Sequence, residues 1–410
     1  MTLKTINKLA IIISWPRELD MLLPLINSLP KNKVVIIAND CFSIEKGRVE
    51  SNKLIIKLLK KKKISYELFS KIYKTKKYKV LISTGEINGK KISFYSLLRF
   101  FYAFTFGYLV EKTNLANIFE KVIGKPLTGD GLNAKLGLPW FPEKEIGEIV
   151  VKYPDGADIK EKNYPYDIFK KVFNIYLSFT DYEISLIKKK FSNSLCKKIE
   201  NPRFLKLSNN KKTFEEFQKN KFFDKNKKNI YWLPTIIDTY DETDINIKIW
   251  FKKISFLKKK FNLIVRPHPK TFLNNKNIIK DLEQYNYIVD YDQSRKIGNI
   301  IENSDIILCD YGGAVFDTLY LKKSLIFLNL PEQSKFDLNQ KNIGSIDVKL
   351  RKRLLSLKVN DSSKSIEEKI FKSLTKGYKK KILISNNLFF GKTKAHNVKK
   401  LGNYLISLLN

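Results

Sequence analysis

Apolar residues in the first half of the chain come in short, uninterrupted runs and do not alternate with polar ones. These runs cover residues 9–14, 34–38 and 79–83, and segments of helical periodicity at 18–29 and 51–62 lie between them. Continuous apolar runs separated by helices are typical of a parallel β-sheet that is covered on both faces. The pattern therefore predicts an α/β domain.

The second half of the chain shows the same alternation more regularly. Apolar runs at 230–233, 263–266, 287–289, 305–309 and 325–328 predict strands, and the segments between them predict helices. A second parallel sheet with helices on both faces follows from this order. The helices expected in this half cover residues 245–260, 277–283, 313–321, 366–374 and 398–409.

A stretch rich in Lys and Asn, with few large apolar residues, separates the two halves. We interpret this stretch, residues 208–229, as a linker between two Rossmann-like domains at 1–207 and 230–385. The last segment, 386–410, is expected to form a helix that packs back on the first domain. The predicted fold class is α/β, with two doubly wound domains that face each other across a cleft.

The composition indicates a globular protein with anionic partners. The 410 residues are 43% hydrophobic, which is enough for two buried cores, and they carry a formal net charge of +36. Such a charge suits nucleic acid, anionic lipid or phosphorylated substrates, and a codon bias toward Lys would produce the same excess. The basic residues are spread over the whole length without a nucleic-acid-binding motif, so no specific nucleic-acid partner is expected.

The cysteines and the N-terminal sequence indicate a cytoplasmic protein. Cys41, Cys196 and Cys309 are odd in number and form no C-x-x-C pair, so they predict reduced thiols, without disulfides or a zinc site. The first apolar run is too short for a signal peptide. Residues 94–110 are rich in Phe, Tyr and Leu but contain Arg99, which disfavours a membrane span. A buried helix and a peripheral membrane contact both stay open for this stretch.

The densest group of candidate site residues follows one strand of the second half. Asp310, Tyr311, Gly312 and Gly313 form a turn that opens a helix, and Asp317 follows one helical turn later. Ligands of open α/β sheets bind at the carboxyl ends of the strands, and glycines at a helix start let an anion approach the N–H groups there. The turn therefore suits nucleotide phosphates, with Asp317 in reach of the ribose. An ordinary strand–turn–helix connection with Asp310 as N-cap gives the same pattern.

A second group lies at the end of another strand, where two prolines stiffen the chain. Arg266, His268 and Lys270 suit a pyrophosphate, and an imidazole can donate a proton to a departing phosphate. A structural histidine is the alternative for His268, and the other histidine of the chain, His396, is expected at the surface. Thr235, after the first strand of this half, is a weaker candidate for a phosphate ligand and is equally well explained as a turn residue.

Together these segments resemble the CDP-glycerol glycerophosphotransferase family. The order of motifs matches: Pro-Thr at 234–235, Arg-Pro-His-Pro at 266–269, Ser-Asp-Ile-Ile-Leu-Cys-Asp-Tyr with Phe-Asp at 304–317, then an apolar strand at 325–328. The resemblance covers about residues 228–332. It implies the GT-B fold, synthesis of teichoic-acid-like or capsular polymers, chemistry without a divalent metal, and peripheral attachment to the cytoplasmic membrane.

The resemblance also implies roles for the candidate residues. His268 and Arg266 would contact the donor phosphates, and the turn from Asp310 to Gly313 would hold the diphosphate beside Asp317. The family commonly has two serines where this chain has its two glycines. In this respect the chain more closely resembles GT-B proteins that use UDP-sugars, including UDP-N-acetylglucosamine 2-epimerases. In those proteins the acidic residue that follows the glycines binds the ribose.

A second departure concerns the catalytic base, which a His-Gly motif of the N-terminal domain supplies in the family. The best candidate here is Asp155 in Tyr-Pro-Asp-Gly, and it offers a carboxylate in place of the imidazole. Pro-Asp-Gly is also common in β-turns, so both interpretations stay open. Arg203, in Asn-Pro-Arg-Phe, resembles the family's segment between the domains and is expected to face the cleft.

The sequence thus predicts a cytoplasmic, metal-independent transferase without a cofactor. It would move a glycerophosphate or related polyol phosphate from a CDP-linked donor, CDP-glycerol in the first instance, to a surface polymer or its lipid-linked precursor. We also expect peripheral contact with the anionic inner face of the membrane. The alternatives are a GT-B glycosyltransferase that uses a UDP- or CMP-sugar, a UDP-sugar 2-epimerase, and a nucleic-acid-binding protein.

Overall fold

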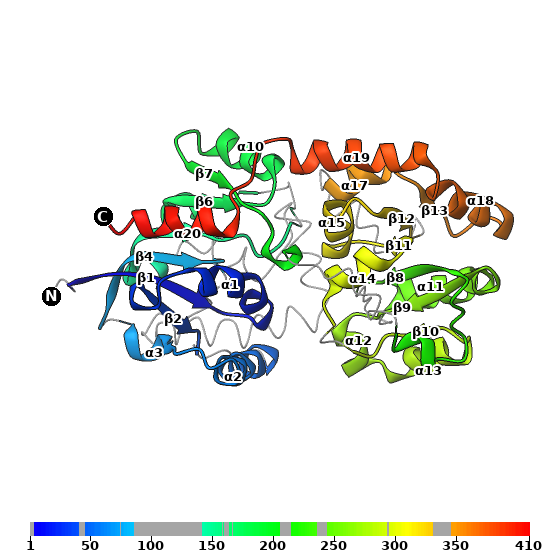
Figure 1. The fold of residues 1–410 in the computed structure, drawn as a ribbon, viewed down its shortest axis with the longest axis horizontal. Coiled ribbons are helices and arrows are strands. Elements are labelled where there is room, and N and C mark those ends of the chain that lie inside the picture. The colour runs from blue at the N-terminus through cyan, green and yellow to red at the C-terminus, as the bar shows by residue number, and fades with distance from the viewer. Residues whose placement is uncertain are drawn as a thin grey trace, which may run out of the picture.

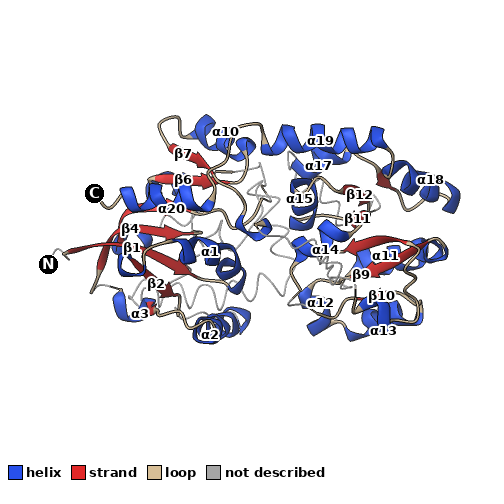
Figure 2. Ribbon diagram, in the orientation of Figure 1, coloured by secondary structure: helices blue, strands red, loops and turns tan. Residues whose placement is uncertain are grey.

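The molecule contains two parallel β-sheets, each flanked by helices, which lie side by side along its long axis (Figure 1). Helices cover both faces of each sheet (Figure 2). The predicted stretch 94–110 and most of the N-terminal half of the predicted linker lie outside the described residues. The computed structural model describes residues 4–40, 46–73, 75–85, 142–157, 159, 164–165, 167–205, 215–235, 244–292, 295–330 and 346–410.

The N-terminal sheet has seven parallel strands in the order β3-β2-β1-β4-β5-β6-β7. The three apolar runs predicted as strands in this half are confirmed as β1, β2 and β4. Chain order reverses between β1 and β4, which is where ligands bind in doubly wound sheets. The strand bounds are β1 Thr5–Ile13, β2 Val34–Ala38, β3 Glu67–Leu68, β4 Lys77–Ser83, β5 Gly147–Lys152, β6 Ile175–Ser178 and β7 Leu195–Lys198.

The helices of this half pack their apolar faces on the sheet. In α1, Leu19, Leu22 and Leu25 recur at helical spacing and are buried in the core beneath β1. The helix begins after a capping box in which the Glu18 carboxylate accepts the Trp15 N–H. The helices are α1 Pro16–Ser28, α2 Lys46–Lys61, α3 Phe69–Ile72, α8 Pro142–Ile146, α9 Asp167–Val172 and α10 Asp181–Lys190.

The C-terminal sheet has six parallel strands in the order β10-β9-β8-β11-β12-β13. Its two faces bury alternate residues of each strand: Tyr231 and Ile307 belong to one apolar cluster, and Trp232 and Leu308 to the other. Both faces are therefore covered, as the uninterrupted apolar runs predicted. The strand bounds are β8 Lys228–Leu233, β9 Phe261–Val265, β10 Ile288–Val289, β11 Ile306–Cys309, β12 Ser324–Leu328 and β13 Ser356–Leu357.

One predicted helix of this half is divided in the structure. The helix expected over 245–260 ends at Ile254, and a 3₁₀ turn, η6 Ser255–Lys259, replaces its last part. The Ser255 hydroxyl donates a hydrogen bond of 2.8 Å to the Lys252 carbonyl, a local bond that competes with helix continuation. The helices are α11 Ile245–Ile254, α12 Pro269–Asn274, α13 Lys276–Gln284, α14 Ile297–Asn303, α15 Gly313–Tyr320, α17 Ile346–Arg351, α18 Ser363–Ser373 and α19 Lys376–Phe390.

The chain end returns to the N-terminal sheet. After α19, Gly391 adopts φ +74°, and a Cβ at this position would collide with the Asp181 carboxylate, so the turn requires glycine. The last helix, α20 Val398–Ser407, then places Leu401 and Leu405 in the core beside α1 (Figure 1). The segment 386–410 thus completes α19 and forms a second helix on the first sheet.

Two chain segments connect the halves and pair with each other. The segment after β7 bridges Ile199 to His396, and the His396 N–H donates to the Lys198 carbonyl at 2.9 Å. The Lys198 amine in turn donates to the Phe390 carbonyl and lies 3.3 Å from the Asp181 carboxylate. The bond to the Phe390 carbonyl thus joins the end of α19 to the segment after β7.

Candidate functional site

The candidate site lies where chain order reverses in the C-terminal sheet. Strands β8 and β11 are neighbours there, with their register running from Ile230 and Ile306 to Leu233 and Cys309. The segments after these two strands therefore leave the sheet side by side. They carry Pro234-Thr235 and the turn that starts at Asp310, which the sequence predicted from their positions at strand ends.

The buried Asp310 side chain connects these two segments by hydrogen bonds. Its side chain is fully buried, and its carboxylate accepts the backbone N–H of Thr235 and of Tyr311, both at 2.8 Å, and the side-chain amide of Asn246. Burial raises the pKa of the carboxyl to about 6, although these hydrogen bonds favour its charged form. The N-cap of α15 is Gly312, so the alternative of Asp310 as N-cap is wrong.

The two glycines leave open space at the start of α15. Gly312 has φ +80° and ψ −160°, a conformation that side chains with a Cβ rarely adopt. Among the residues that the structure describes, a Cβ added there would meet only the Thr235 hydroxyl, at 3.6 Å, and one added at Gly313 would meet nothing within 4 Å. An anion can therefore approach the N–H groups at the helix start, with Thr235 beside it.

Arg266 and His268 follow β9 at the same edge of the sheet. The Arg266 guanidinium donates to the Arg295 carbonyl at 2.9 Å and lies 3.7 Å from the Asp290 carboxylate. His268 is partly buried, and its carbonyl accepts the N–H of Thr271 at 2.8 Å, within the turn that starts α12. The side chain of Lys270 lies outside the described part of the chain. The roles of these three residues stay predictions.

Asp290 is the acid that sequence reasoning missed. Its side chain is 1% exposed, accepts the Tyr231 hydroxyl, and lies 3.3 Å from the Arg295 guanidinium. Two arginines thus converge on one buried carboxylate, which holds Arg266 at the carboxyl end of β9. The available signal was its position directly after the strand predicted at 287–289, which the structure shows as Ile288–Val289.

Arg351 is a second residue that the sequence did not indicate. Its guanidinium lies 3.9 Å from the centre of the Tyr311 ring and 4.5 Å from that of Phe327, and it donates to the Asn329 side chain. Stacking of this kind fixes the Tyr311 ring next to the Asp310 turn. Tyr311, predicted as a donor-binding residue, is thereby buried against the protein.

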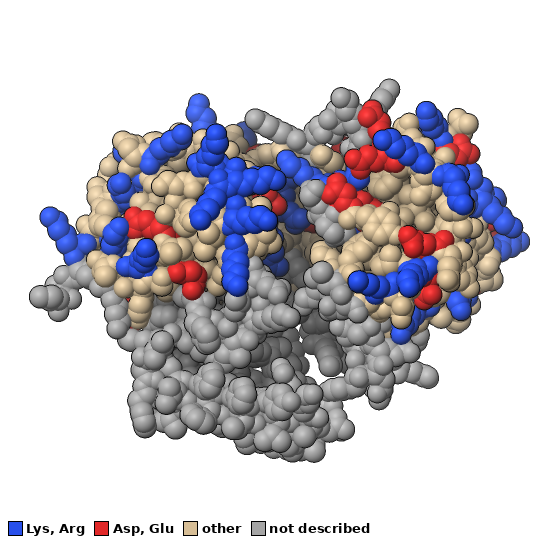
Figure 3. All heavy atoms as spheres, turned by 90° about the horizontal axis from the view of Figure 1, so that it is seen from below, with Lys and Arg blue, Asp and Glu red and all other residues tan. Residues whose placement is uncertain are grey.

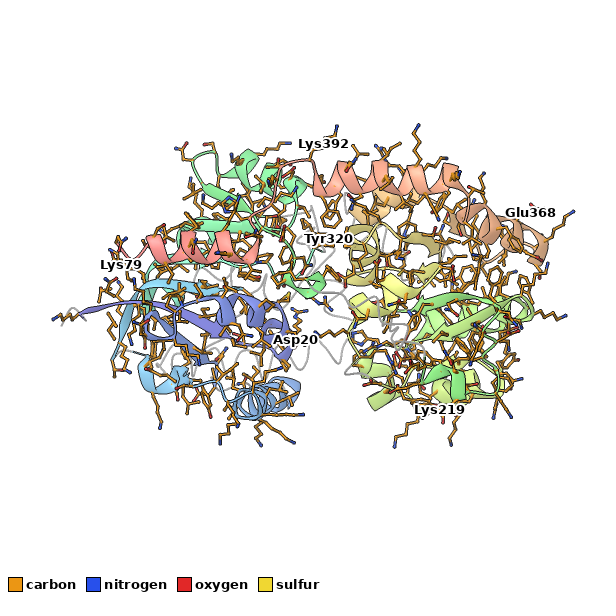
Figure 4. The ribbon with its side chains drawn as sticks, viewed as in Figure 1. Asp20, Lys79, Lys219, Tyr320, Glu368 and Lys392 are labelled. Carbon is orange, nitrogen blue, oxygen red and sulfur yellow. The ribbon has the colours of Figure 1, made fainter. Side chains whose placement is uncertain are left out.

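Asp317 and Arg203 meet across the two domains. The Arg203 guanidinium donates to the Asp317 carboxylate at 3.3 Å, and the side chains are 37% and 10% exposed. Burial raises the pKa of the Asp317 carboxyl, and the charge of Arg203 limits the rise. Nearby, Phe204 stacks on Tyr320 with ring centres 5.0 Å apart. Figure 4 shows Tyr320 between the two domains.

Asp155 lies in the other domain, after β5. Its carboxylate is 42% exposed and lies 3.6 Å from the guanidinium of Arg17, in the first turn of α1. The structure therefore places Asp155 at the carboxyl edge of the N-terminal sheet, and its role as a base stays a prediction. The described residues contain no group of three or more His, Cys, Asp or Glu side chains that could hold a metal ion.

Solved structures confirm the predicted fold class, two parallel-sheet α/β domains of the GT-B type. The chain aligns over 99% of its length with 89% of the wall teichoic acid polymerase TagF, in a variant soaked with CDPG, at 12% identity and a TM-score of 0.54. All of the chain aligns with 96% of a Listeria monocytogenes protein described as a UDP-N-acetylglucosamine 2-epimerase, at 9% identity and a TM-score of 0.52. Likenesses at such identities establish the fold alone.

The family comparison is more specific than the fold. No curated protein matches the chain. Residues 156–338 match the family model described as CDP-Glycerol:Poly(glycerophosphate) glycerophosphotransferase. This segment contains Arg203 and all of the candidate residues from Thr235 to Asp317, and Asp155 directly precedes it. The predicted resemblance to the CDP-glycerol glycerophosphotransferase family is therefore confirmed, and it extends over residues 156–338.

Proposed function

We propose that this chain transfers a glycerophosphate unit from CDP-glycerol to a hydroxyl group of a teichoic-acid-type polymer or its lipid-linked precursor. The observation that carries the proposal is the open glycine turn at the point where chain order reverses, inside the segment that matches the family. Such a turn suits the diphosphate of a nucleotide-linked donor.

The reaction is a displacement at the phosphorus that carries glycerol. An acceptor oxygen forms a new P–O bond to this phosphorus, and the P–O bond to CMP breaks. The hydroxyl proton goes to a base, for which Asp155 is our candidate, and His268 donates a proton to the departing CMP phosphate. Phosphoryl transfer of this kind depends on positioning and on charge neutralisation, which the start of α15 and Arg266 would supply.

We further propose that the reaction needs neither a divalent metal nor a cofactor, and that it takes place at the cytoplasmic side of the membrane. The cationic groups named above can neutralise the diphosphate charge. A nucleic-acid partner fits less well, because the Lys and Arg side chains in Figure 3 lie over both domains with acidic side chains among them.

The test is the release of CMP from CDP-glycerol in the presence of an acceptor bearing glycerol phosphate. We expect release that depends on the acceptor and is unchanged by EDTA. Inhibition by EDTA that Mg²⁺ reverses would contradict metal independence alone. Release of UDP from a UDP-sugar, with CDP-glycerol inert, would contradict the proposal and indicate a glycosyltransferase. Gly312 and Gly313 favour that alternative, because they resemble the glycines of enzymes that use UDP-sugars.

A further inference from the structure

A buried acidic side chain lies directly beside the glycine turn that suits the donor diphosphate. The Asp310 carboxylate is fully buried and accepts the backbone N–H of Tyr311, the residue that precedes Gly312. A charged carboxylate repels a nearby phosphate, and burial strengthens the repulsion because the local dielectric constant is low. The turn can therefore hold an anion well only if a positive charge offsets Asp310.

Arg351, at the end of helix α17, lies where it can supply this charge. Its guanidinium lies 3.9 Å from the centre of the Tyr311 ring and 4.5 Å from that of Phe327, and it donates to the Asn329 side chain. Tyr311 follows β11, and Phe327 lies in the neighbouring strand β12. Stacking on two rings and a hydrogen bond to the end of β12 thus fix the cation beside the Asp310 turn.

The electrostatic effects at the turn agree with this placement. Burial raises the pKa of the Asp310 carboxyl to about 6, and the charge of Arg351 opposes this rise together with the hydrogen bonds. Two further titratable groups act here: the Cys309 thiol, whose pKa burial raises well above its usual range, and Asp317, which pairs with Arg203. Arg203 thus offsets the charge of Asp317, and Arg351 offsets that of Asp310.

We infer that Arg351 is a positioning residue of the donor site, where its guanidinium offsets the charge of Asp310 and so lets the turn at Gly312 bind an anionic diphosphate. Arg351 acts through Asp310 and Tyr311 and needs no contact of its own with the donor. The inference rests on the donor site of the proposed function, but it does not depend on the transfer step. A purely structural role, in which Arg351 only supports the Tyr311 ring, would give a different pH dependence.

That pH dependence follows from the protonation of Asp310. At about pH 8.5 the carboxyl is charged, so removal of Arg351 leaves a negative charge without its counter-charge beside the diphosphate. At about pH 5.5, below its pKa of about 6, the carboxyl is mostly neutral, so there is less charge to offset. Groups that titrate in both proteins, such as His268, cancel when a variant is compared with the parent at one pH.

The test measures donor binding without an acceptor, by calorimetric titration of the full chain with CDP-glycerol. Arg351→Gln should weaken binding about tenfold at the higher pH and less than about threefold at the lower one, since a neighbouring opposite charge changes such an equilibrium by about one pKa unit. Arg351→Lys keeps the charge and should retain most of the affinity at both pH values. Arg353→Gln, at an exposed arginine close by in the sequence, is the matched control and should bind like the parent.

Three results would overturn the inference. An equal loss in Arg351→Gln at the two pH values would mean that Arg351 only supports the Tyr311 ring. The same would follow if Arg351→Lys bound as weakly as Arg351→Gln at the higher pH. Parent affinity in Arg351→Gln at the higher pH would remove Arg351 from the donor site. Circular dichroism verifies folding, and Arg351→Met, which keeps an apolar stem between the two rings, replaces Arg351→Gln if that variant does not fold.

A failure of the proposed function gives a different result. If the parent binds UDP-N-acetylglucosamine and not CDP-glycerol, the proposed donor is wrong, and the same pH comparison is made with the UDP-sugar. If the parent binds neither, the turn is no diphosphate site, and the inference is wrong as well. Binding of CDP-glycerol with the expected difference between the two pH values, but without CMP release, would contradict the transfer step alone.

Discussion

The carboxyl edges of the two sheets are built differently, although both are reversal points of doubly wound sheets. In the C-terminal sheet, Asp310 accepts hydrogen bonds from both turns, and a Cβ added at Gly313 would meet no described atom within 4 Å. In the N-terminal sheet, the corresponding place is filled: the buried Glu18 carboxylate accepts the Ser14 N–H and the Thr84 hydroxyl, both at 2.6 Å, and closes the gap between β1 and β4. Within the described residues, the reversal point of the C-terminal sheet is therefore the more open of the two.

The difference between the two edges indicates which domain binds the donor and which contributes to the acceptor step. A diphosphate needs N–H groups that no protein group already occupies, and within the described residues the start of α15 offers such space. At the carboxyl edge of the N-terminal sheet, the exposed acid Asp155 lies one strand further along. The donor would then be held by the C-terminal domain, and the N-terminal domain would contribute to the acceptor step.

The largest effect is expected from His268→Ala. Removal of a general acid costs about 10²–10⁴ in turnover, and the partly buried ring is not part of an apolar cluster, so the fold should persist. CMP release measures the turnover of the variant, and thermal unfolding shows whether its fold persists. His396→Ala, at the only other histidine, is the matched control and should keep activity. Normal turnover in folded His268→Ala protein would remove His268 from the mechanism.

Asp290→Asn should lower the free energy of unfolding, because it removes a carboxylate at the same edge of the C-terminal sheet. The substitution leaves Arg266 and Arg295 buried without their shared carboxylate, a situation that costs about 3–5 kcal/mol. Urea unfolding measures the loss, and the KM for CDP-glycerol should rise in whatever protein remains folded. Asp292→Asn, an exposed acid 3.8 Å from the same Arg295, is the control and should lose little. Similar losses in both variants would argue against the buried network.

Asp155→Asn tests whether Asp155, at the carboxyl edge of the N-terminal sheet, acts as the base. If the carboxylate is the base, turnover falls about a hundredfold while the donor binds as before, since the donor lies in the other domain. Calorimetric titration with CDP-glycerol and CMP release separate the two effects. Arg17→Gln, which removes only the partner at 3.6 Å, should cost much less. Equal losses in both variants would mean that the ion pair, and not the base, accounts for the effect.

Much of the fold could be predicted because its signal is local. The core strands β2, β8 and β11 are buried on both faces, so each is an apolar run that can be read without knowledge of its neighbours. The edge strand β7, Leu-Cys-Lys-Lys, gave no such signal, because an edge strand needs few apolar residues and Leu195 is 49% exposed. Strand position in the sheet therefore decided what the pattern could reveal.

The site was predictable only in part for a related reason. Residues directly after long strands, such as Arg266 and Asp310, could be found, because the edge they occupy follows from the topology. Their partners could not: Asn246 is 64 positions from Asp310, and Arg203 is 114 positions from Asp317. Such pairs exist only after tertiary packing, and one sequence does not contain the distances that create them.

A last and smaller effect again distinguishes the two domains, through the pH dependence of stability. Glu143, buried in α8 with the Ser83 hydroxyl 3.4 Å away, has its pKa raised by burial from 4.5 to about 7. As the pH rises, this carboxyl therefore loses its proton at a lower pH in the unfolded chain than in the folded one. The free energy of unfolding should then fall as the pH rises from about 4.5 to 7. Glu143→Gln stays neutral, so it should be more stable than the parent by about 1–3 kcal/mol at pH 8 and nearly equal at pH 4.5.

Urea unfolding at both pH values measures this difference. Glu148→Gln is the control of opposite sign, because a hydrogen bond from Lys79 lowers the pKa of that carboxyl and its charged form favours the fold. That variant should be the less stable one at pH 8. A difference between parent and Glu143→Gln that is the same at pH 4.5 and pH 8 would mean that Glu143 is already charged in the fold.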